Sequence, residues 1–291
     1  MRKVLALSLA LILLLGITSH GTSAYFSDTE TSAGNTFTAW VEEEEVVRSM
    51  FNVSDFTGNK IYKYDDSGSF VGSFNLSGDN EFPTGVAAVG DYVYVIDHAD
   101  KQVYRYGCSG GTPVVSRTLL KADGNSSIGN IDGLAIDIVV PGEMWVLSGK
   151  KNIYQYSLSA AFLDDGSSLP AVFEIALDNK GAAGLAIDST YLYVLDYDTS
   201  SKETRFYRYL RTDGSVTVSK VLKEMGGGDL DSPAGAMFDG TSLWVVDSGT
   251  NKVYEYDDVY DNEDSLFSGS GSQNAISEFP LHPDNGDATG L

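Results

Sequence analysis

The sequence is poor in the residues that build disulfide frameworks, metal centres and nucleic-acid surfaces. Among its 291 residues there are one Cys and three His, and 19 Lys plus Arg stand against 41 Asp plus Glu, a net charge of −22. A single cysteine excludes an intramolecular disulfide. The shortage of basic residues argues against nucleic-acid partners and anionic membrane surfaces, which need clustered Lys and Arg. With 42% hydrophobic and 11% aromatic residues, the chain still has the material for a sizeable core.

No apolar run is long enough to span a bilayer comfortably. The longest, residues 4–17, follows Arg2 and Lys3 and precedes small residues at 22–24. A charged start, a short apolar middle and a small-residue end are the features of a secretory signal peptide. We therefore expect residues 1–24 to be a signal that is cleaved at its end, with an uncleaved signal anchor as the alternative. The mature chain is then expected to be secreted, with no membrane span.

A resemblance begins at the expected cleavage site. The chain there reads Ala24-Tyr25-Phe26-Ser27-Asp28-Thr29-Glu30-Thr31-Ser32-Ala33-Gly34-Asn35-Thr36-Phe37-Thr38-Ala39. This string resembles the N-terminus of the camelysin/TasA group of secreted surface and biofilm-fibre proteins, which a dedicated signal peptidase releases. Over residues 1–41 the resemblance implies export. It implies either a filament subunit, with residues 25–41 pairing into a neighbour's sheet edge, or only a shared processing signal. We assign residues 25–49 to an N-terminal arm or linker.

Residues 50–291 form a repeat array. A Gly-hydrophobic-Ala-like start recurs at spacings of 48, 51, 51 and 55 residues, at Gly85, Gly133, Gly184, Gly235 and Gly290. A strand-like run, a polar turn and a pair of tyrosines follow each of the first four starts. A period near 50 residues with several short alternating strands indicates a β-propeller. The sequence therefore predicts an all-β fold with four-stranded blades over residues 50–291.

The two ends of the array complement each other. The N-terminal copy, around Ile61-Tyr62-Lys63-Tyr64, lacks the Gly-Leu-Ala strand, and the C-terminal copy stops as that strand begins, at Ala288-Thr289-Gly290-Leu291. We expect the N- and C-terminal strands to close one blade together, giving about five blades and hiding sheet edges. Residues 277–281 read as an outer strand, which suits Pro280. A truncated chain that lacks a sixth blade is the alternative.

The repeat also carries a resemblance of its own. In the form Gly-Leu-Ala-x-Asp, then Leu-Tyr-Val-x-Asp, then Val-Tyr-x-Tyr, it resembles the NHL, YncE and gluconolactonase-like propellers over about residues 50–291. The resemblance implies the architecture. It implies no single activity, because that fold serves scaffolds, lyases, lactonases and oxidoreductases. The Glu, Asn and Asp ligands of the lactonases cannot be matched residue by residue here.

Few residues suit catalysis. His98 and His282 are the histidines of the expected mature chain; they stand at different repeat offsets and read as solvated turn residues. Two histidines cannot build a three-His metal site. Cys108 has no histidine near it in sequence, so we expect no nucleophilic role. We assign no catalytic and no cofactor-binding residue and favour a non-enzymatic chain.

Carboxylates and aromatic residues recur at fixed offsets. One offset holds Asp55, Asp97, Asp196 and Asp247, and another holds Asp137, Asp188 and Asp239. A residue repeated in this way usually serves the fold, and Asp closes turns by accepting backbone N–H bonds. The aromatic offset holds Tyr94, Trp145, Tyr193 and Trp244. Their shared position predicts packing between blades. The alternative, a functional one, is an aromatic platform that binds a sugar.

An acidic loop after the last tyrosine pair is the weak metal candidate. Its carboxylates are Asp257, Asp258, Asp261 and Asp264. Ca²⁺ prefers several such oxygens, although the spacing matches no Asp-x-Asp-x-Asp-Gly loop. The alternative is a solvated acidic loop.

Three Asn-x-Ser sequons are candidate N-glycosylation sites in an exported chain: Asn52, Asn75 and Asn125. Asn52 falls inside a predicted strand.

Taken together, these features predict a secreted binding or structural protein of a cell surface or extracellular matrix. Its partner would be a protein or a carbohydrate, or further copies of itself in a fibre. The alternative is a lactonase-like hydrolase or lyase with a Ca²⁺-dependent site in the central funnel.

Overall fold

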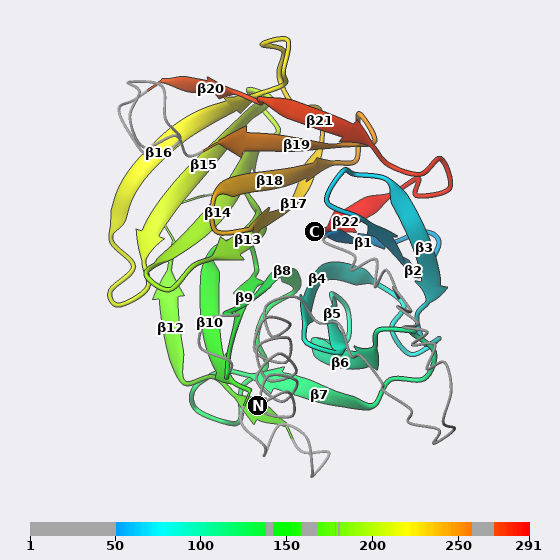
Figure 1. The fold of residues 1–291 in the computed structure, drawn as a ribbon. Coiled ribbons are helices and arrows are strands. Elements are labelled where there is room, and N and C mark those ends of the chain that lie inside the picture. Colours follow the sequence, from blue (N-terminus) through cyan, green and yellow to red (C-terminus); the bar gives the residue numbers. More distant parts are fainter. Residues whose placement is uncertain (1–50, 138–141, 159–167, 178, 180, 258–270) are drawn as a thin grey trace, which may run out of the picture. The chain divides into compact units, whose positions relative to one another are not determined.

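The repeats fold into five antiparallel sheets arranged as blades around a common axis (Figure 1). The computed structural model describes residues 51–137, 142–158, 168–177, 179, 181–257 and 271–291. The five-bladed propeller predicted from the repeat is confirmed. The described residues contain no helix long and apolar enough to cross a bilayer.

Each blade has four strands that run antiparallel from the axis outward. The inner strands are β22 (Ala288–Gly290), β4 (Pro83–Val89), β8 (Ile131–Ile136), β13 (Ala182–Ile187) and β17 (Pro233–Phe238). The second strands are β1 (Phe51–Asp55), β5 (Tyr92–Asp97), β9 (Glu143–Ser148), β14 (Tyr191–Asp198) and β18 (Ser242–Asp247). The third strands are β2 (Lys60–Tyr64), β6 (Gln102–Gly107), β10 (Asn152–Ser157), β15 (Glu203–Leu210) and β19 (Lys252–Asp257). The outer strands are β3 (Phe70–Asn75), β7 (Val115–Leu120), β12 (Phe173–Ala176), β16 (Val216–Lys223) and β21 (Ser277–Pro280).

Two blades gain a fifth strand that the repeat did not predict. Strand β11 (Leu169–Pro170) pairs in parallel with β7, and β20 (Ser272–Asn274) pairs in parallel with β16. Both come from the connection between the third and outer strands of the following blade. An outer strand presents unpaired backbone groups, so the added strand covers an edge that would otherwise be open.

The predicted closure of the ring is confirmed. Strand β22 pairs antiparallel with β1, with Gly290 opposite Ser54 and Ala288 opposite Asp55. Thr289 then joins this blade to the next, because its hydroxyl donates a hydrogen bond of 2.6 Å to the carbonyl of Pro83 in β4. The first and last strands therefore share one blade, which we call blade 1.

The core lies between neighbouring blades, where the repeated aromatic residues are buried. The ring of Phe51 in blade 1 meets Trp244 in the last blade edge-on, with centroids 4.7 Å apart. Trp145 packs in a cluster with Leu185 and Leu192 of the next blade. The prediction that the aromatic offset packs between blades is confirmed for Tyr94, Trp145, Tyr193 and Trp244, all of which are buried.

The turns between second and third strands share one backbone signature. Each contains one non-glycine residue with φ between 48° and 61°: Asn59, Lys101, Lys150, Lys202 and Asn251. The preceding Asp closes the turn in several blades. The Asp97 carboxylate, for example, accepts hydrogen bonds from the backbone N–H groups of Ala99 and Asp100, both at 2.8 Å. The repeated carboxylates thus serve the fold, as their fixed offset predicted.

Candidate functional site: an axial cavity

Five glycines, one from each inner strand, bring those strands into close backbone contact around the axis. A Cβ atom on Gly85 would lie 2.8 Å from the backbone nitrogen of Leu134, and one on Gly235 would lie 2.7 Å from that of Leu291. Gly184 and Gly290 make equally close approaches, whereas a Cβ atom on Gly133 would lie 3.3 Å from the backbone nitrogen of Leu185. Only a residue without a side chain fits at such distances. The recurring Gly of the sequence repeat is therefore the residue that lets the ring close.

Beyond this glycine ring the axis widens into a cavity of about 310 Å³. Its wall is built mainly from the second halves of the inner strands. The residues that line it are Asn52, Val86, Ala87, Ala88, Leu134, Ala135, Ile136, Leu185, Ala186, Ile187, Ala236, Met237, Phe238, Asp239 and Leu291. The wall is mainly apolar, with one amide and one carboxylate. Concave, mostly apolar sites with few polar groups are the usual form of ligand pockets in proteins.

Asn52 breaks the repeat at this cavity. The residue three positions before the repeated Asp or Ser of the second strand is aromatic in the other four blades. It faces an inner-strand residue, such as Ala135 opposite Trp145 or Ala186 opposite Tyr193. In blade 1 the same position is Asn52. Strand β22 pairs with β1 only at Ser54 and Asp55, so the inner edge of β1 at Asn52 is turned to the cavity.

The Asn52 side chain is buried but not satisfied. It is 6% exposed, and its Oδ1 atom has no hydrogen-bond partner among the described residues. A buried acceptor that lacks a donor costs about 1–3 kcal/mol. The Oδ1 atom has almost no accessible surface, so Asn52 is a buried polar residue in a wall that is otherwise mainly apolar. Comparison of the aromatic offset across the repeats could have identified this residue from sequence.

The carboxylate on the cavity wall already accepts hydrogen bonds from within the protein. Asp239 accepts hydrogen bonds from the backbone of Thr241 and Ser242, each at 2.7 Å, and from Nε1 of Trp244 at 2.7 Å. Burial by itself raises the pKa of Asp239, but these hydrogen bonds outweigh it and hold the pKa below its ordinary value. Asp188 binds Thr190, Tyr191 and the Tyr193 hydroxyl in the same manner. These carboxylates orient aromatic side chains between blades.

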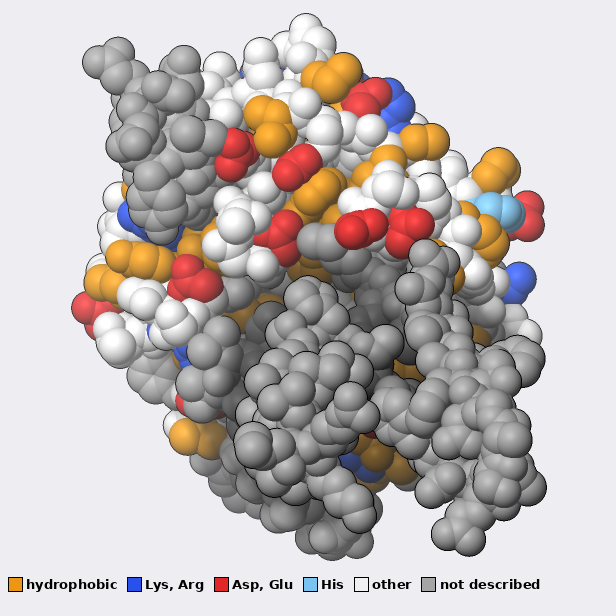
Figure 2. All heavy atoms as spheres, viewed as in Figure 1, with side chains coloured by type: hydrophobic (Ala, Val, Ile, Leu, Met, Phe, Trp, Pro, Cys, Tyr) orange, Lys and Arg blue, Asp and Glu red, His pale blue; other side chains and the backbone are white. Residues whose placement is uncertain are grey.

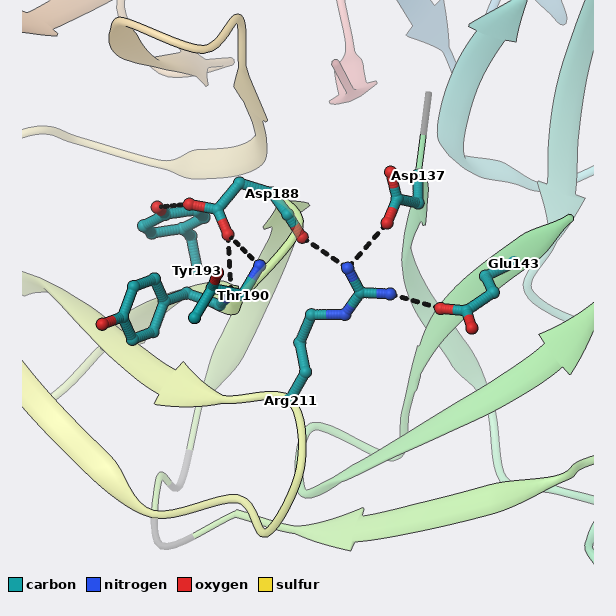
Figure 3. A network of polar contacts seen from close by, with 7 residues as sticks. Asp137, Glu143, Asp188, Thr190, Tyr193 and Arg211 are labelled. Atoms are coloured by element: carbon teal, nitrogen blue, oxygen red, sulfur yellow. Dashed lines mark hydrogen bonds and ion pairs between the residues drawn. The ribbon is translucent and has the colours of Figure 1, made fainter. Parts of the chain in front are cut away.

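The third member of that carboxylate series, Asp137, takes part in an ion-pair network between two blades (Figure 3). Arg211, just after β15, places its guanidinium between Asp137, at 2.6 Å, and Glu143. The same guanidinium also donates to the backbone carbonyl of Asp188 at 2.7 Å. Arg211 further lies over the Trp145 ring at 5.4 Å. The guanidinium of one blade thus binds carboxylates of the neighbouring blade, and the network connects the two blades.

A histidine and a carboxylate meet on the side of the ring where the inner strands begin. Nδ1 of His98 lies 2.8 Å from the carbonyl of Ile131 and 3.6 Å from Oδ1 of Asp132. Burial raises the pKa of Asp132, although it accepts a hydrogen bond from the Lys150 backbone. The histidine side chain is one-third exposed. His98 thus contacts the following blade, which the interpretation as a solvated turn residue did not include.

The predicted metal candidates lie mostly outside the described residues. Asp257 ends β19, whereas Asp258, Asp261 and Asp264 fall in the undescribed range 258–270. Within the part of the chain that the structure describes, no three His, Cys, Asp or Glu side chains gather as a metal site. The expectation of Ca²⁺ in the acidic loop therefore stays a prediction.

The sequon asparagines occupy different surroundings. Asn75 and Asn125 are exposed, at the end of β3 and in the turn that follows β7. Asn52 is buried in the cavity wall, where a glycan has no room in the folded chain.

Cys108 is exposed and forms no disulfide. Figure 2 shows acidic side chains spread among apolar and uncharged ones over the described part of one face.

No protein-family model matches the chain, and no curated protein matches its sequence. Solved β-propellers are similar in structure. Glutaminyl cyclase of Myxococcus xanthus aligns at 12% identity and a TM-score of 0.48 over 67% of this chain and 70% of that one. A chain of the nidogen/laminin complex aligns at 15% identity and a TM-score of 0.46, over 82% of this chain and 95% of that one. Virginiamycin B lyase from Staphylococcus aureus aligns at 11% identity and a TM-score of 0.42, over 87% of this chain and 76% of that one. Identities this low say nothing about the activity of this chain.

Proposed function

We propose that this protein is an exported, non-enzymatic binding protein of a cell surface or extracellular matrix, which takes a mainly apolar ligand in its axial cavity. One observation carries the proposal: the inner strands enclose a mainly apolar cavity on the axis, and the amide residue in its wall, Asn52, stands at the position where the repeat is broken. An apolar wall favours ligand binding by burial, and a single polar group orients what is bound.

The cavity can be tested with Nile red, an uncharged apolar dye whose fluorescence rises when it leaves water. Saturable binding is expected for the wild type. Ala88 is exposed and lines the cavity, so Ala88→Trp places a large side chain in the cavity without disturbing the core. We expect this variant to lose binding. The matched control, Ala99→Trp, changes an exposed residue in the turn after β5 and should bind like the wild type. Equal binding by all three chains would contradict the proposal.

Export and assembly form the second part of the proposal. The signal-like residues 1–24 and the camelysin/TasA-like string after them support secretion. A secreted chain should then begin at Tyr25 by intact mass. As a filament subunit, the mature chain should polymerise with concentration, and a chain that begins at residue 50 should stay monomeric in sedimentation. If the mature chain is monomeric at high concentration, assembly is excluded. Lactone turnover with added Ca²⁺ would instead favour the enzyme.

A further inference from the structure

One hairpin between a second and a third strand is longer than the other four. It joins β14 to β15 in the fourth blade along the chain, which we call blade 4, and each of these strands has eight residues where β5 and β6 have six. Eleven positions separate Asp196 from Tyr207, whereas six or seven separate the equivalent residues of the other blades. Insertions into single repeats of such arrays form loops that often carry binding. The longer hairpin is therefore a candidate for a role beyond the fold.

A cavity of about 580 Å³ lies beside this hairpin. Hairpin residues line it together with Lys150, from the turn after β9, and Gly181, from the segment before β13. Its volume is within the range of about 300–1,000 Å³ that small-molecule sites have. In contrast to the axial cavity, its wall is mostly polar and contains the carboxylates of Asp196 and Glu203 and the guanidinium of Arg205. A molecule that fills this cavity must therefore be polar as well.

The hydroxyl of Tyr207, in the same wall, differs from its equivalents. In every blade a tyrosine of the third strand lies opposite a valine of the second strand: Tyr62, Tyr104, Tyr154, Tyr207 and Tyr254. Four of these hydroxyls donate to groups of the protein, as Tyr104 does to the carbonyl of Asp79 at 2.8 Å. The Tyr207 hydroxyl makes no hydrogen bond with a described residue, and it is not sealed inside the core. It is therefore available to a molecule in the cavity.

The groups around Tyr207 both donate and accept hydrogen bonds. Arg205 directs Nε and Nη2 to Oε1 of Glu203, at 3.1 and 2.6 Å, so Oε2 of this carboxylate has no partner among the described residues. Asp196 accepts the backbone N–H of Gly181 at 2.7 Å. Burial, and then the nearby Asp196 carboxylate, raise the pKa of Tyr207, so its hydroxyl stays protonated at neutral pH. The wall thus offers one ligand a donor at Tyr207 and an acceptor at Glu203.

The charges of the wall select the chemistry of the ligand. The carboxylates of Asp196, Asp198 and Glu203 are accompanied by Lys150 and Arg205, so neither sign dominates. The described residues hold no group of three His, Cys, Asp or Glu side chains that could bind a metal ion. An uncharged ligand with several hydroxyl groups fits such a wall, because a hydroxyl both donates and accepts. Its bonds to the charged groups are also stronger than bonds between neutral groups.

We propose that the cavity between the β14–β15 hairpin and the preceding blade binds a neutral sugar, whose hydroxyl groups accept a hydrogen bond from Tyr207 and donate one to Glu203. This goes beyond the proposed function, since it is a second site for a ligand of different chemistry. The two cavities share no lining residue. The protein then carries an apolar site on its axis and a sugar site at the seam between two blades.

The probes are the methyl glycosides of glucose, galactose, mannose and N-acetylglucosamine. Each is titrated into the mature chain, and binding is followed by saturation-transfer NMR. We expect saturable binding of at least one of them. Glutamine, which offers an ammonium and a carboxylate in place of several hydroxyls, should not displace the bound sugar.

Two variants test the contacts, and a third is the matched control. Tyr207→Phe removes one hydroxyl and should weaken sugar binding about fivefold, and Glu203→Gln removes a charged acceptor and should weaken it about tenfold. Neither should move the urea midpoint, because the Tyr207 hydroxyl has no partner in the fold and the Glu203 pair is exposed. Tyr104→Phe, at the same position of another blade, should lower the midpoint and leave sugar affinity unchanged.

The inference is overturned if none of the four glycosides binds, or if Tyr207→Phe and Glu203→Gln bind sugar like the wild type. Displacement of the sugar by glutamine also overturns it, since the cavity would then be a site for a zwitterion. Equal destabilisation by Tyr207→Phe and Tyr104→Phe would give the Tyr207 hydroxyl a role in the fold instead. Ala88→Trp, which fills the axial cavity, should abolish Nile red binding and leave sugar binding intact. Loss of sugar binding in that variant would place the sugar on the axis and overturn the inference, whereas failure of Nile red to bind the wild type overturns the proposed function alone.

Discussion

Gly290 of the last strand and Gly85 of the second blade stand so close that a Cβ atom on Gly290 would lie 2.7 Å from the Cα of Gly85. The same Cβ would lie 3.0 Å from the carbonyl oxygen of Thr84. This contact between opposite ends of the propeller sequence completes the ring of inner strands. The residue at position 290 is therefore limited by the neighbouring backbone.

The first prediction concerns this contact. Gly290→Ala forces two inner strands apart, and such overpacking is expected to lower the free energy of unfolding by about 1–3 kcal/mol. A Cβ on Gly72, in β3, would meet nothing within 4 Å, so Gly72→Ala should change stability by less than about 0.5 kcal/mol. Urea unfolding of both variants is the measurement. Equal stability of the two would show that the ring tolerates a side chain.

A second prediction concerns closure by β22. Removal of residues 288–291 opens blade 1 and exposes the surface that Leu291, 6% exposed, covers. Loss of one buried Leu alone costs about 2–5 kcal/mol. We expect unfolding at lower urea concentration and faster amide exchange in β1. The peptide Ala-Thr-Gly-Leu, added at high concentration, should partly restore protection. Unchanged exchange in β1 after truncation would contradict the role of this strand.

Arg211 and Arg205 offer a matched pair of ion-pair tests. The Asp137 side chain that Arg211 binds is 2% exposed, whereas Arg205 and its partner Glu203 are 33% and 40% exposed. Removing one partner of a buried pair costs about 3–5 kcal/mol, and an exposed pair contributes about 0–1 kcal/mol. Thermal unfolding should therefore show a large loss for Arg211→Met and almost none for Arg205→Met.

The double variant Arg211→Met with Asp137→Asn gives a further check. Neutralising the carboxylate removes the buried charge that Arg211 leaves behind, so the double variant should be more stable than Arg211→Met alone. If the two substitutions were additive, Arg211 would not act through Asp137.

The last prediction concerns pH. Hydrogen bonds from Ser242, Trp244 and Thr241 hold the pKa of Asp239 below its ordinary value in the fold, despite burial. A depressed carboxyl pKa adds stability above the ordinary Asp pKa of about 3.9, and that stability is lost as pH falls through the lower folded value. Asp239→Asn should therefore cost about 1–2 kcal/mol at pH 7, with the difference from wild type shrinking below about pH 4. A difference that is constant with pH would contradict this.

Much of the architecture was predictable because the same residue types make the same contacts in successive repeats. Gly85 and its equivalents recur because every inner strand approaches a neighbour closely. Tyr94, Trp145, Tyr193 and Trp244 recur because each of these four blades packs an aromatic residue against the next blade. The complementary ends at Phe51 and Gly290 were predictable for the same reason. The two additional strands, β11 and β20, were not, because they pair across blades and follow no repeat offset.

The candidate site followed the opposite pattern. At the cavity, Asn52 replaces the aromatic residue that the other four blades have at this position. A search for recurring residues does not find a residue that occurs in one repeat only. The Arg211 network was likewise invisible, since a loop of one blade reaches carboxylates of another that lie far away in sequence.

The sequence by itself determined the fold class and predicted about five blades with the first and last strands paired, because the period, the glycine offset and the strand alternation recur in every repeat. The structure decided for five blades over six. Only the tertiary structure decided where the axis is open. Whether a buried polar atom finds a partner depends on contacts among all five inner strands at once, and no local pattern encodes that sum.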